Sequence, residues 1–137
     1  GPYSRFQLKQ YIEQTQNDLF ADRQLRLMIE NGNRQVVGIV DLCSFDPLHN
    51  RAEVGIMVDK SCRRQGIGRN ALALLEEHCF RYLGIHQLFA YIAVENLPSR
   101  RLFAACGYKE SAVLKEWAHT FGGGYTDVLV VQKLNLS

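Results

Sequence analysis

Three early segments of the chain are typical of strands, because two alternate between hydrophobic and polar residues with a period of two and one is a continuous apolar run. The first covers residues 25–29 and the second is the apolar run at residues 36–42. The tripeptide Asn-Gly-Asn at residues 31–33 separates them, and such a connection favours a tight turn. A third segment, which again alternates, follows at residues 51–59. The pattern therefore predicts an antiparallel hairpin followed by a third strand.

Hydrophobic residues recur at helical spacing in three other segments. Residues 4–19 place most of their apolar side chains on one side of a 3.6-residue period, which predicts a surface helix. Residues 66–83 give the best-defined helix, and Gly84 is placed to end it. A shorter helix begins near Pro98, because proline is tolerated in a first turn, and ends at Gly107.

Strand-like segments at residues 87–94, 108–117 and 125–134 complete the chain. The predicted order is helix, three strands, helix, strand, helix and two strands. This order predicts an α/β (α+β) fold in which helices flank a mixed, mostly antiparallel central sheet. We expect a single domain over residues 1–137.

The composition excludes several classes of function. Sixteen Lys and Arg residues against 14 Asp and Glu leave a net charge of +2, too small and too evenly spread for a nucleic-acid-binding surface. No apolar run reaches the ~18 residues needed to cross a membrane. The four cysteines have no spacing typical of a metal site. We therefore expect a cytoplasmic protein with free thiols and with no metal, nucleic-acid or membrane partner.

A glycine-containing turn joins the third strand to the long helix and carries the sequence RRQGIG at residues 63–68. The first N–H groups of a helix have no intrahelical acceptor, and the helix dipole stabilises a phosphate there by about 0.3–1 kcal/mol. Gly66 and Gly68 lack a Cβ, so a pyrophosphate can approach the backbone closely. The cations that could neutralise its charge are Arg63, Arg64 and Arg69.

Two kinds of phosphate site fit this turn. GIGRNA at residues 66–71 matches the GxGxxA form of the dinucleotide fingerprint, with Glu95 as a possible ribose partner. That fold places its glycines after the first strand of a parallel set, whereas three antiparallel-type strands are predicted to precede them here. A pyrophosphate site outside a dinucleotide fold is therefore favoured, and a dinucleotide-binding module stays open as an alternative.

Three motifs follow one another along the chain. RRQGIG at residues 63–68 matches [RQ]xxGx[GA], and NLPS at 96–99 with RLFAACGY at 101–108 is similar to NxxS…LYxxxGF. GYTDV at 124–128 is similar to GxYxD. On these motifs nearly the whole chain resembles the GNAT superfamily of N-acetyltransferases, and in particular its ribosomal-protein and polyamine acetyltransferase branch. The chain is expected to lack the family's usual first strand and helix.

The resemblance implies how coenzyme A would bind. Backbone amides at residues 65–69 would hold the pyrophosphate, Met57 and Val58 would hydrogen-bond the pantetheine arm, and Asn96 would contact this arm across a gap between two strands. Helix capping is the alternative role for Asn96 and Ser99. The implied contacts with coenzyme A are Met57, Val58, Arg63, Arg64, Gln65, Gly66, Ile67, Gly68, Arg69, Asn96, Ser99 and Phe103.

The resemblance also implies catalytic residues. An alkylammonium has a pKa near 10.4, so acyl transfer to an amine needs a base. Glu53 holds the strand position of the carboxylate that deprotonates the acceptor in the family, and its alternative is a surface pair with Arg51. Phe103 stands where many members carry the tyrosine that protonates the leaving thiolate. Ser99 or Tyr108, or a water molecule, would then be the acid.

We therefore predict an acetyl-CoA-dependent N-acetyltransferase that works by direct transfer in a ternary complex. Its acceptor would be a primary amine of a polyamine-like small molecule or of a peptide or protein. A degenerate domain that binds or senses acyl-CoA without turnover is one alternative, and the dinucleotide-binding module is another. Edge strands near the C-terminus are compatible with a homodimer.

Overall fold

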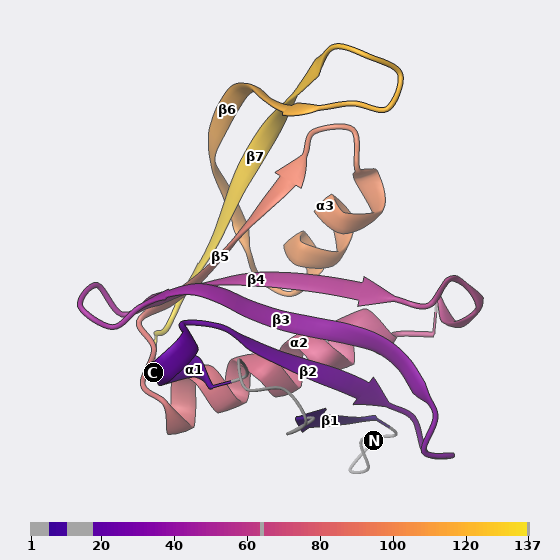
Figure 1. The fold of residues 1–137 in the computed structure, drawn as a ribbon, viewed down its shortest axis with the longest axis vertical. Coiled ribbons are helices and arrows are strands. Elements are labelled where there is room, and N and C mark those ends of the chain that lie inside the picture. Colours follow the sequence, from indigo (N-terminus) through magenta and orange to yellow (C-terminus); the bar gives the residue numbers. More distant parts are fainter. Residues whose placement is uncertain (1–5, 11–17, 64, 137) are drawn as a thin grey trace.

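A seven-stranded sheet forms the centre of the computed structural model, which describes residues 6–10, 18–63 and 65–136 (Figure 1). Its strands are β1 (Gln7–Gln10), β2 (Leu25–Glu30), β3 (Val36–Asp46), β4 (Arg51–Val58), β5 (Gln87–Ala93), β6 (Lys109–His119) and β7 (Tyr125–Leu134). They lie in the order β1-β2-β3-β4-β5-β7-β6, and every pair of neighbours is antiparallel except β4 and β5. The predicted mixed, mostly antiparallel sheet is confirmed.

The β2–β3 hairpin forms where the alternating pattern predicts it. The Asn31 side-chain oxygen accepts hydrogen bonds from the backbone N–H groups of Asn33 and Gln35, both at 2.9 Å, and so closes the turn. Leu27 of β2 and Val40 of β3 are direct partners and both are buried. The hairpin therefore contributes one hydrophobic face to the core.

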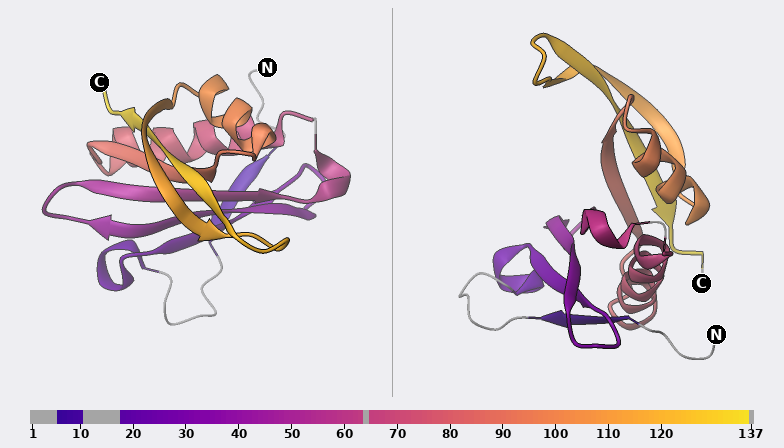
Figure 2. Two further views of the ribbon diagram at one scale, coloured as in Figure 1. Left: turned by 90° about the horizontal axis from the view of Figure 1, so that it is seen from above. Right: turned by 90° about the vertical axis from the view of Figure 1, so that its right-hand side faces the viewer.

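Helices α2 (Ile67–Glu77) and α3 (Leu97–Ala105) lie on the same side of the sheet (Figure 2). Helix α2 continues into a π-helical turn at His78–Tyr82, and a short helix α1 (Leu19–Asp22) precedes β2. Leu72 and Leu75 of α2 are fully buried in the main core together with Phe103 of α3. Burying a leucine side chain contributes about 1.5–3 kcal/mol, so this packing fixes both helices against the sheet. None of the described helices is long and apolar enough to cross a membrane.

Strands β4 and β5 pair over a short distance only. Their register covers Arg51 with Gln87, Ala52 with Leu88 and Glu53 with Phe89. Beyond these pairs the strands diverge, as Figure 1 shows, while β5 remains paired with β7 along its whole length. The C-terminal half of β4 therefore faces a gap, and no strand among the described residues pairs with it on that side.

The N-terminal prediction is wrong in part. Residues 7–10 of the predicted helix form β1, in which Leu8 pairs with Ile29 and Lys9 Nζ lies 3.1 Å from Glu30 Oε1. The edge of β2 supplies backbone partners that outweigh the weak helical pattern of these residues. The expectation that the chain lacks a strand ahead of the hairpin is corrected by the same finding. Residues 4, 5 and 11–17 of the predicted helix lie outside the described residues.

The topology argues against the dinucleotide alternative. A dinucleotide fold carries its glycine turn after the first strand of a parallel set. Here the turn follows β4, which pairs antiparallel with β3 and touches a single parallel neighbour over three residues. The glycine turn therefore lies at the edge of a diverging pair of strands rather than in a parallel sheet.

Candidate active site

A cavity of about 610 Å³ opens where β4 ends and α2 begins. It is bounded by the last residues of β4, the turn into α2 and the first turns of α3. The described residues on its wall are Ile56, Met57, Val58, Cys62, Arg63, Gly66, Ile67, Gly68, Arg69, Asn96, Pro98, Ser99 and Leu102. The cavity therefore continues the gap between β4 and β5 up to the N-terminus of α2.

Gly66 shapes the entrance to α2. It is the N-cap residue with φ of +75°, a left-handed conformation that costs other L-residues about 1–2 kcal/mol. A Cβ built on Gly66 meets no described atom within 4 Å, so this side of the backbone is open. The first intrahelical hydrogen bond runs from Asn70 N–H to the Gly66 carbonyl. The N–H groups of residues 67–69 precede it and are available to an anion in the cavity.

Gly68 has a different task, which is to let α2 and α3 approach each other. A Cβ at Gly68 would lie 3.0 Å from Leu102 Cδ2, closer than side chains normally pack. Leu102 lies on the cavity wall, so this close approach brings α3 next to the first turn of α2. In the RRQGIG motif, Gly66 therefore keeps the backbone open to the cavity, and Gly68 allows α2 and α3 to pack closely.

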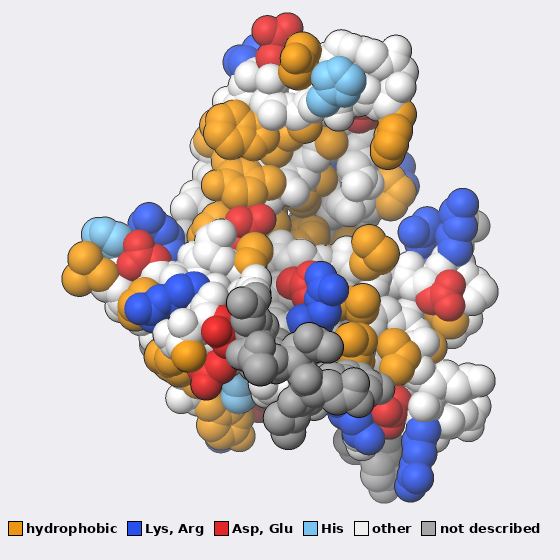
Figure 3. All heavy atoms as spheres, viewed as in Figure 1, with side chains coloured by type: hydrophobic (Ala, Val, Ile, Leu, Met, Phe, Trp, Pro, Cys, Tyr) orange, Lys and Arg blue, Asp and Glu red, His pale blue; other side chains and the backbone are white. Residues whose placement is uncertain are grey.

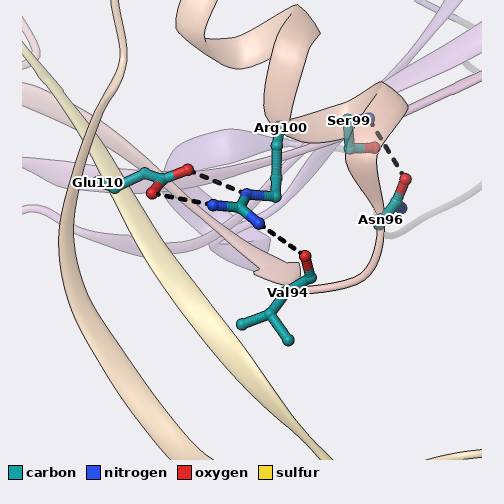
Figure 4. Close-up of polar contacts among 5 residues, drawn as sticks. All are labelled: Val94, Asn96, Ser99, Arg100 and Glu110. Atoms are coloured by element: carbon teal, nitrogen blue, oxygen red, sulfur yellow. Dashed lines mark hydrogen bonds and ion pairs between the residues drawn. The ribbon is translucent and has the colours of Figure 1, made fainter.

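The first turn of α3 forms the opposite wall. The Asn96 side-chain oxygen accepts a hydrogen bond from the Ser99 N–H at 3.2 Å, which caps the helix (Figure 4). The Arg100 guanidinium donates to the Val94 carbonyl at 2.8 Å and to both Glu110 oxygens at 3.1 and 3.3 Å. Arg100 thus ties the start of α3 to the end of β5 and to β6. Capping uses the oxygen of Asn96, so its amide NH₂ remains a donor toward the cavity.

The charge on the cavity wall suits an anion. Arg63 and Arg69 are exposed at its rim, and no acidic residue is among the described lining residues. Arg64, a third predicted contact, lies outside the described residues. Together with the helix N-terminus, the two arginines form the positive environment that a pyrophosphate requires.

Nine of the twelve residues implied for coenzyme A line the cavity. Of the other three, Gln65 and Phe103 are not on its wall, and Arg64 is outside the described residues. Sequence reasoning missed four further lining residues: Ile56, Cys62, Pro98 and Leu102. Pro98 and Leu102 are four positions apart, and this spacing on a short helix could have indicated a shared face.

Glu53 lies at the closed end of the gap. It belongs to the last β4–β5 pair and is half-buried, opposite Cys43 on β3. Ser44 Oγ lies 3.4 Å from its Oε1, a weak hydrogen bond at most. Arg51, its alternative partner, instead contacts Asp46 with 3.7 Å between Nη2 and Oδ2. Burial, followed by the charge of Glu53, raises the pKa of Cys43. The carboxylate therefore contacts Ser44 and Cys43 on β3, and Glu53 is not among the described residues that line the cavity.

The two acid candidates lie in different surroundings. Ser99 is on the cavity wall, whereas Tyr108 is 4% exposed and packs edge to face against Phe103 at 4.9 Å. Burial, followed by the charge of Glu76, raises the pKa of Tyr108 far above its usual range. The Tyr108 hydroxyl has no hydrogen-bond partner among the described residues. This placement favours Ser99 over Tyr108 as a proton donor and makes Phe103 a core residue.

Two diverging strands and a helix N-terminus with a backbone opening form a site of the kind that an acyl-CoA-dependent acyltransferase uses. Comparison with known proteins gives the family. Residues 1–109 match the acetyltransferase (GNAT) domain, so the chain belongs to this family of acetyl-CoA-dependent enzymes. The predicted resemblance and enzyme class are confirmed.

The most similar proteins found include a spermidine N(1)-acetyltransferase of Vibrio cholerae. It is 27% identical over 128 residues, which cover 93% of this chain and 72% of the relative. A dodecameric structure of spermidine N-acetyltransferase from Vibrio cholerae superimposes with a TM-score of 0.79 at 25% identity. The match covers 85% of this chain and 68% of the Vibrio cholerae chain. The Vibrio cholerae enzyme in complex with CoA and spermine has a TM-score of 0.78 at 25% identity, with coverages of 85% and 69%.

Proposed function

We propose that this chain transfers the acetyl group of acetyl-CoA to a primary amine of a polyamine-like small molecule. The observation that carries the proposal is a cavity at the N-terminus of α2 whose wall includes the end of β4, and Glu53 lies in the last β4–β5 pair ahead of it. The polyamine class of the acceptor is supported by the spermidine acetyltransferase relatives. A peptide or protein amine is the second acceptor class to be tested.

The binding roles follow from the cavity wall. The N–H groups of the first α2 turn and the side chains of Arg63 and Arg69 would hold the pyrophosphate of coenzyme A. The backbone of Met57 and Val58 would hydrogen-bond the pantetheine amides as an added strand, because the gap leaves this edge without a paired strand. The Asn96 amide would donate to the pantetheine arm from the other side.

Glu53 would supply the proton transfer that the acceptor needs. At pH 7 an ammonium of pKa near 10.4 requires about 5 kcal/mol to become a free amine. Glu53 would accept this proton, directly or through water. The amine nitrogen then bonds to the thioester carbon while the carbon–sulfur bond breaks, and the Val58 N–H would stabilise the carbonyl oxygen. The nitrogen loses its second proton as the amide forms, and a proton relayed through Ser99 or water ends on the thiolate. This leaves an amide and free coenzyme A, while Glu53 returns its proton to solvent.

Thiol release from acetyl-CoA tests the proposal with spermidine, a monoamine and an N-terminal peptide as acceptors. Glu53→Gln should lower kcat about 100-fold, as expected for loss of a general base, with little change in the Kd for acetyl-CoA. Glu95→Gln is the matched control, since Glu95 is an exposed carboxylate beside α3 that the dinucleotide alternative would use. Equal loss of turnover and of acetyl-CoA binding in Glu53→Gln would make Glu53 a structural residue.

Binding without turnover would support the degenerate alternative. A melting temperature that rises with acetyl-CoA and CoA but not with NAD, without thiol release for any amine, is the expected signature of a domain that only senses acyl-CoA. A shift with NAD alone would contradict both acyl-CoA proposals.

Self-association and cellular location are proposed on separate grounds. β6 is an edge strand whose side chains are mostly exposed, and such an edge favours pairing with a second copy. We therefore propose a homo-oligomer with a dimer as its smallest unit, which sedimentation velocity would detect.

All four cysteines are free thiols, which supports a reducing, cytoplasmic location.

A further inference from the structure

Three aromatic side chains form a row on the side of the sheet opposite α2 and α3. The rings of Phe89 and Tyr91 meet edge to face with centroids 5.8 Å apart, and Trp117 stacks on Tyr91 with centroids at 6.5 Å and planes 26° apart. Tyr91 is 45% exposed and Trp117 is 61% exposed. The row starts beside Glu53, because Phe89 is its direct partner on β5. Figure 3 shows hydrophobic side chains gathered over β6 and β7 on this face.

A bulge in β6 sets the outer end of this aromatic row. The β6–β7 register passes from Leu114 with Val128 to Ala118 with Thr126, so residues 115–117 stand opposite one residue of β7. Bulges of this kind redirect side chains and occur next to active sites. Trp117 is the last residue of the bulge, directly before pairing resumes.

That single opposing residue is Asp127, the aspartate of the GYTDV motif. Its Oδ1 accepts the Glu116 N–H at 2.8 Å and its Oδ2 accepts the Lys115 ammonium at 2.7 Å. Glu116 has φ of +50°, a conformation that needs such support. The Asp127 carboxylate thus holds the bulge from which Trp117 reaches over Tyr91.

We propose that the aromatic row is a subsite for the distal ammonium group and methylene chain of a polyamine. This inference rests on the proposed function and adds how the acceptor is selected. Ring faces attract cations and their apolar surfaces cover methylene groups. A four-carbon spacer between two amines spans about 6 Å, which is the spacing of neighbouring rings in the row. With its reacting amine at Glu53, a polyamine would lay its methylene chain along Phe89 and an ammonium group farther along the chain on Tyr91 and Trp117.

The test is a comparison of Trp117→Ala with the unaltered protein, using spermidine and butylamine as acceptors at saturating acetyl-CoA. The variant should lower kcat/KM for spermidine about fivefold, mainly through KM, as expected for loss of an exposed cation–π contact. Its kcat/KM for butylamine, which has no second ammonium group, and its KM for acetyl-CoA should not change. Trp117→Phe should retain part of the preference for spermidine.

Two further variants keep the test specific. Phe121→Ala removes an exposed aromatic of the same hairpin that lies outside the aromatic row, and it should leave the preference unchanged. Asp127→Ala releases the bulge and should weaken spermidine selectively, like Trp117→Ala. Equal losses for both amines in Trp117→Ala, or a change of oligomer size with unchanged selectivity, would overturn the subsite. If the unaltered protein acetylates no amine, the proposed function itself fails, which is a distinct result.

Discussion

Replacing Gly66 with aspartate tests the phosphate site most directly. The open space beside Gly66 would receive a carboxylate where the pyrophosphate is expected to lie. At a separation of about 5 Å and an effective dielectric constant near 20, one pair of like charges repels by about 3 kcal/mol. Solvent at this exposed rim reduces the repulsion to about 2 kcal/mol. We therefore expect the Kd for CoA to rise about 30-fold from charge alone.

The matched control is Gly66→Asn. Asparagine has nearly the same shape as aspartate and must adopt the same left-handed conformation at φ of +75°, so both variants lose about 1 kcal/mol of stability for the backbone. Only the charge differs between them. The Kd for CoA is measured by isothermal titration calorimetry for both variants, and melting temperatures confirm that both fold.

Affinities for CoA that agree within twofold between the two variants would refute the reasoning. In that case no phosphate lies near Gly66, and the arginines at the rim would have no role in binding. A melting temperature far lower for the aspartate variant would show instead that the carboxylate disturbs the fold.

Two stability predictions complete the set. Lys133 donates hydrogen bonds to the buried carboxylate of Glu76 and to the Cys106 carbonyl. Lys133→Met should therefore lower the free energy of unfolding measured in urea by about 3 kcal/mol, because it leaves a buried charge unpaired. Adding Glu76→Leu should recover most of this loss. An additive double variant would contradict the coupling of the pair. The hydrogen bond from Lys115, followed by that from the Glu116 N–H, lowers the pKa of Asp127, so its stabilisation is present above the unfolded-state pKa and is lost as the pH falls through the folded-state pKa. Asp127→Asn should flatten the acid side of a melting temperature profile between pH 2 and 6, and an unchanged slope would show that the carboxylate contributes nothing.

Local patterns predicted the elements that are stabilised locally. The turn at residues 31–33 and the long amphipathic face of α2 carry their own signals, and both are found where the sequence places them. β1 carries no such signal, because it exists through pairing with β2, and a weak helical period in a longer window obscured it. Tertiary pairing decides such short segments.

The candidate site shows a similar division. The glycine turn and Asn96 were found from their residues and from the family resemblance, since both occur in short contiguous motifs. The opening between β4 and β5 has no local signature, because it results from where pairing stops. Contacts between residues far apart in the chain could not be predicted either. Lys133 and Glu76 pair across 57 positions, and no motif indicates that Asp127 holds the bulge before Trp117.

Because β4 and β5 pair over only three residues, the C-terminal part of β4 keeps unpaired backbone groups on the side of β5. On the proposed function, the pantetheine amides of the cosubstrate would hydrogen-bond these groups as an additional strand would. Binding would then add to the free energy of unfolding by about 2.7 kcal/mol at 100 times the Kd. The supply of acetyl-CoA would therefore raise the stability of the folded protein as well as its rate of catalysis.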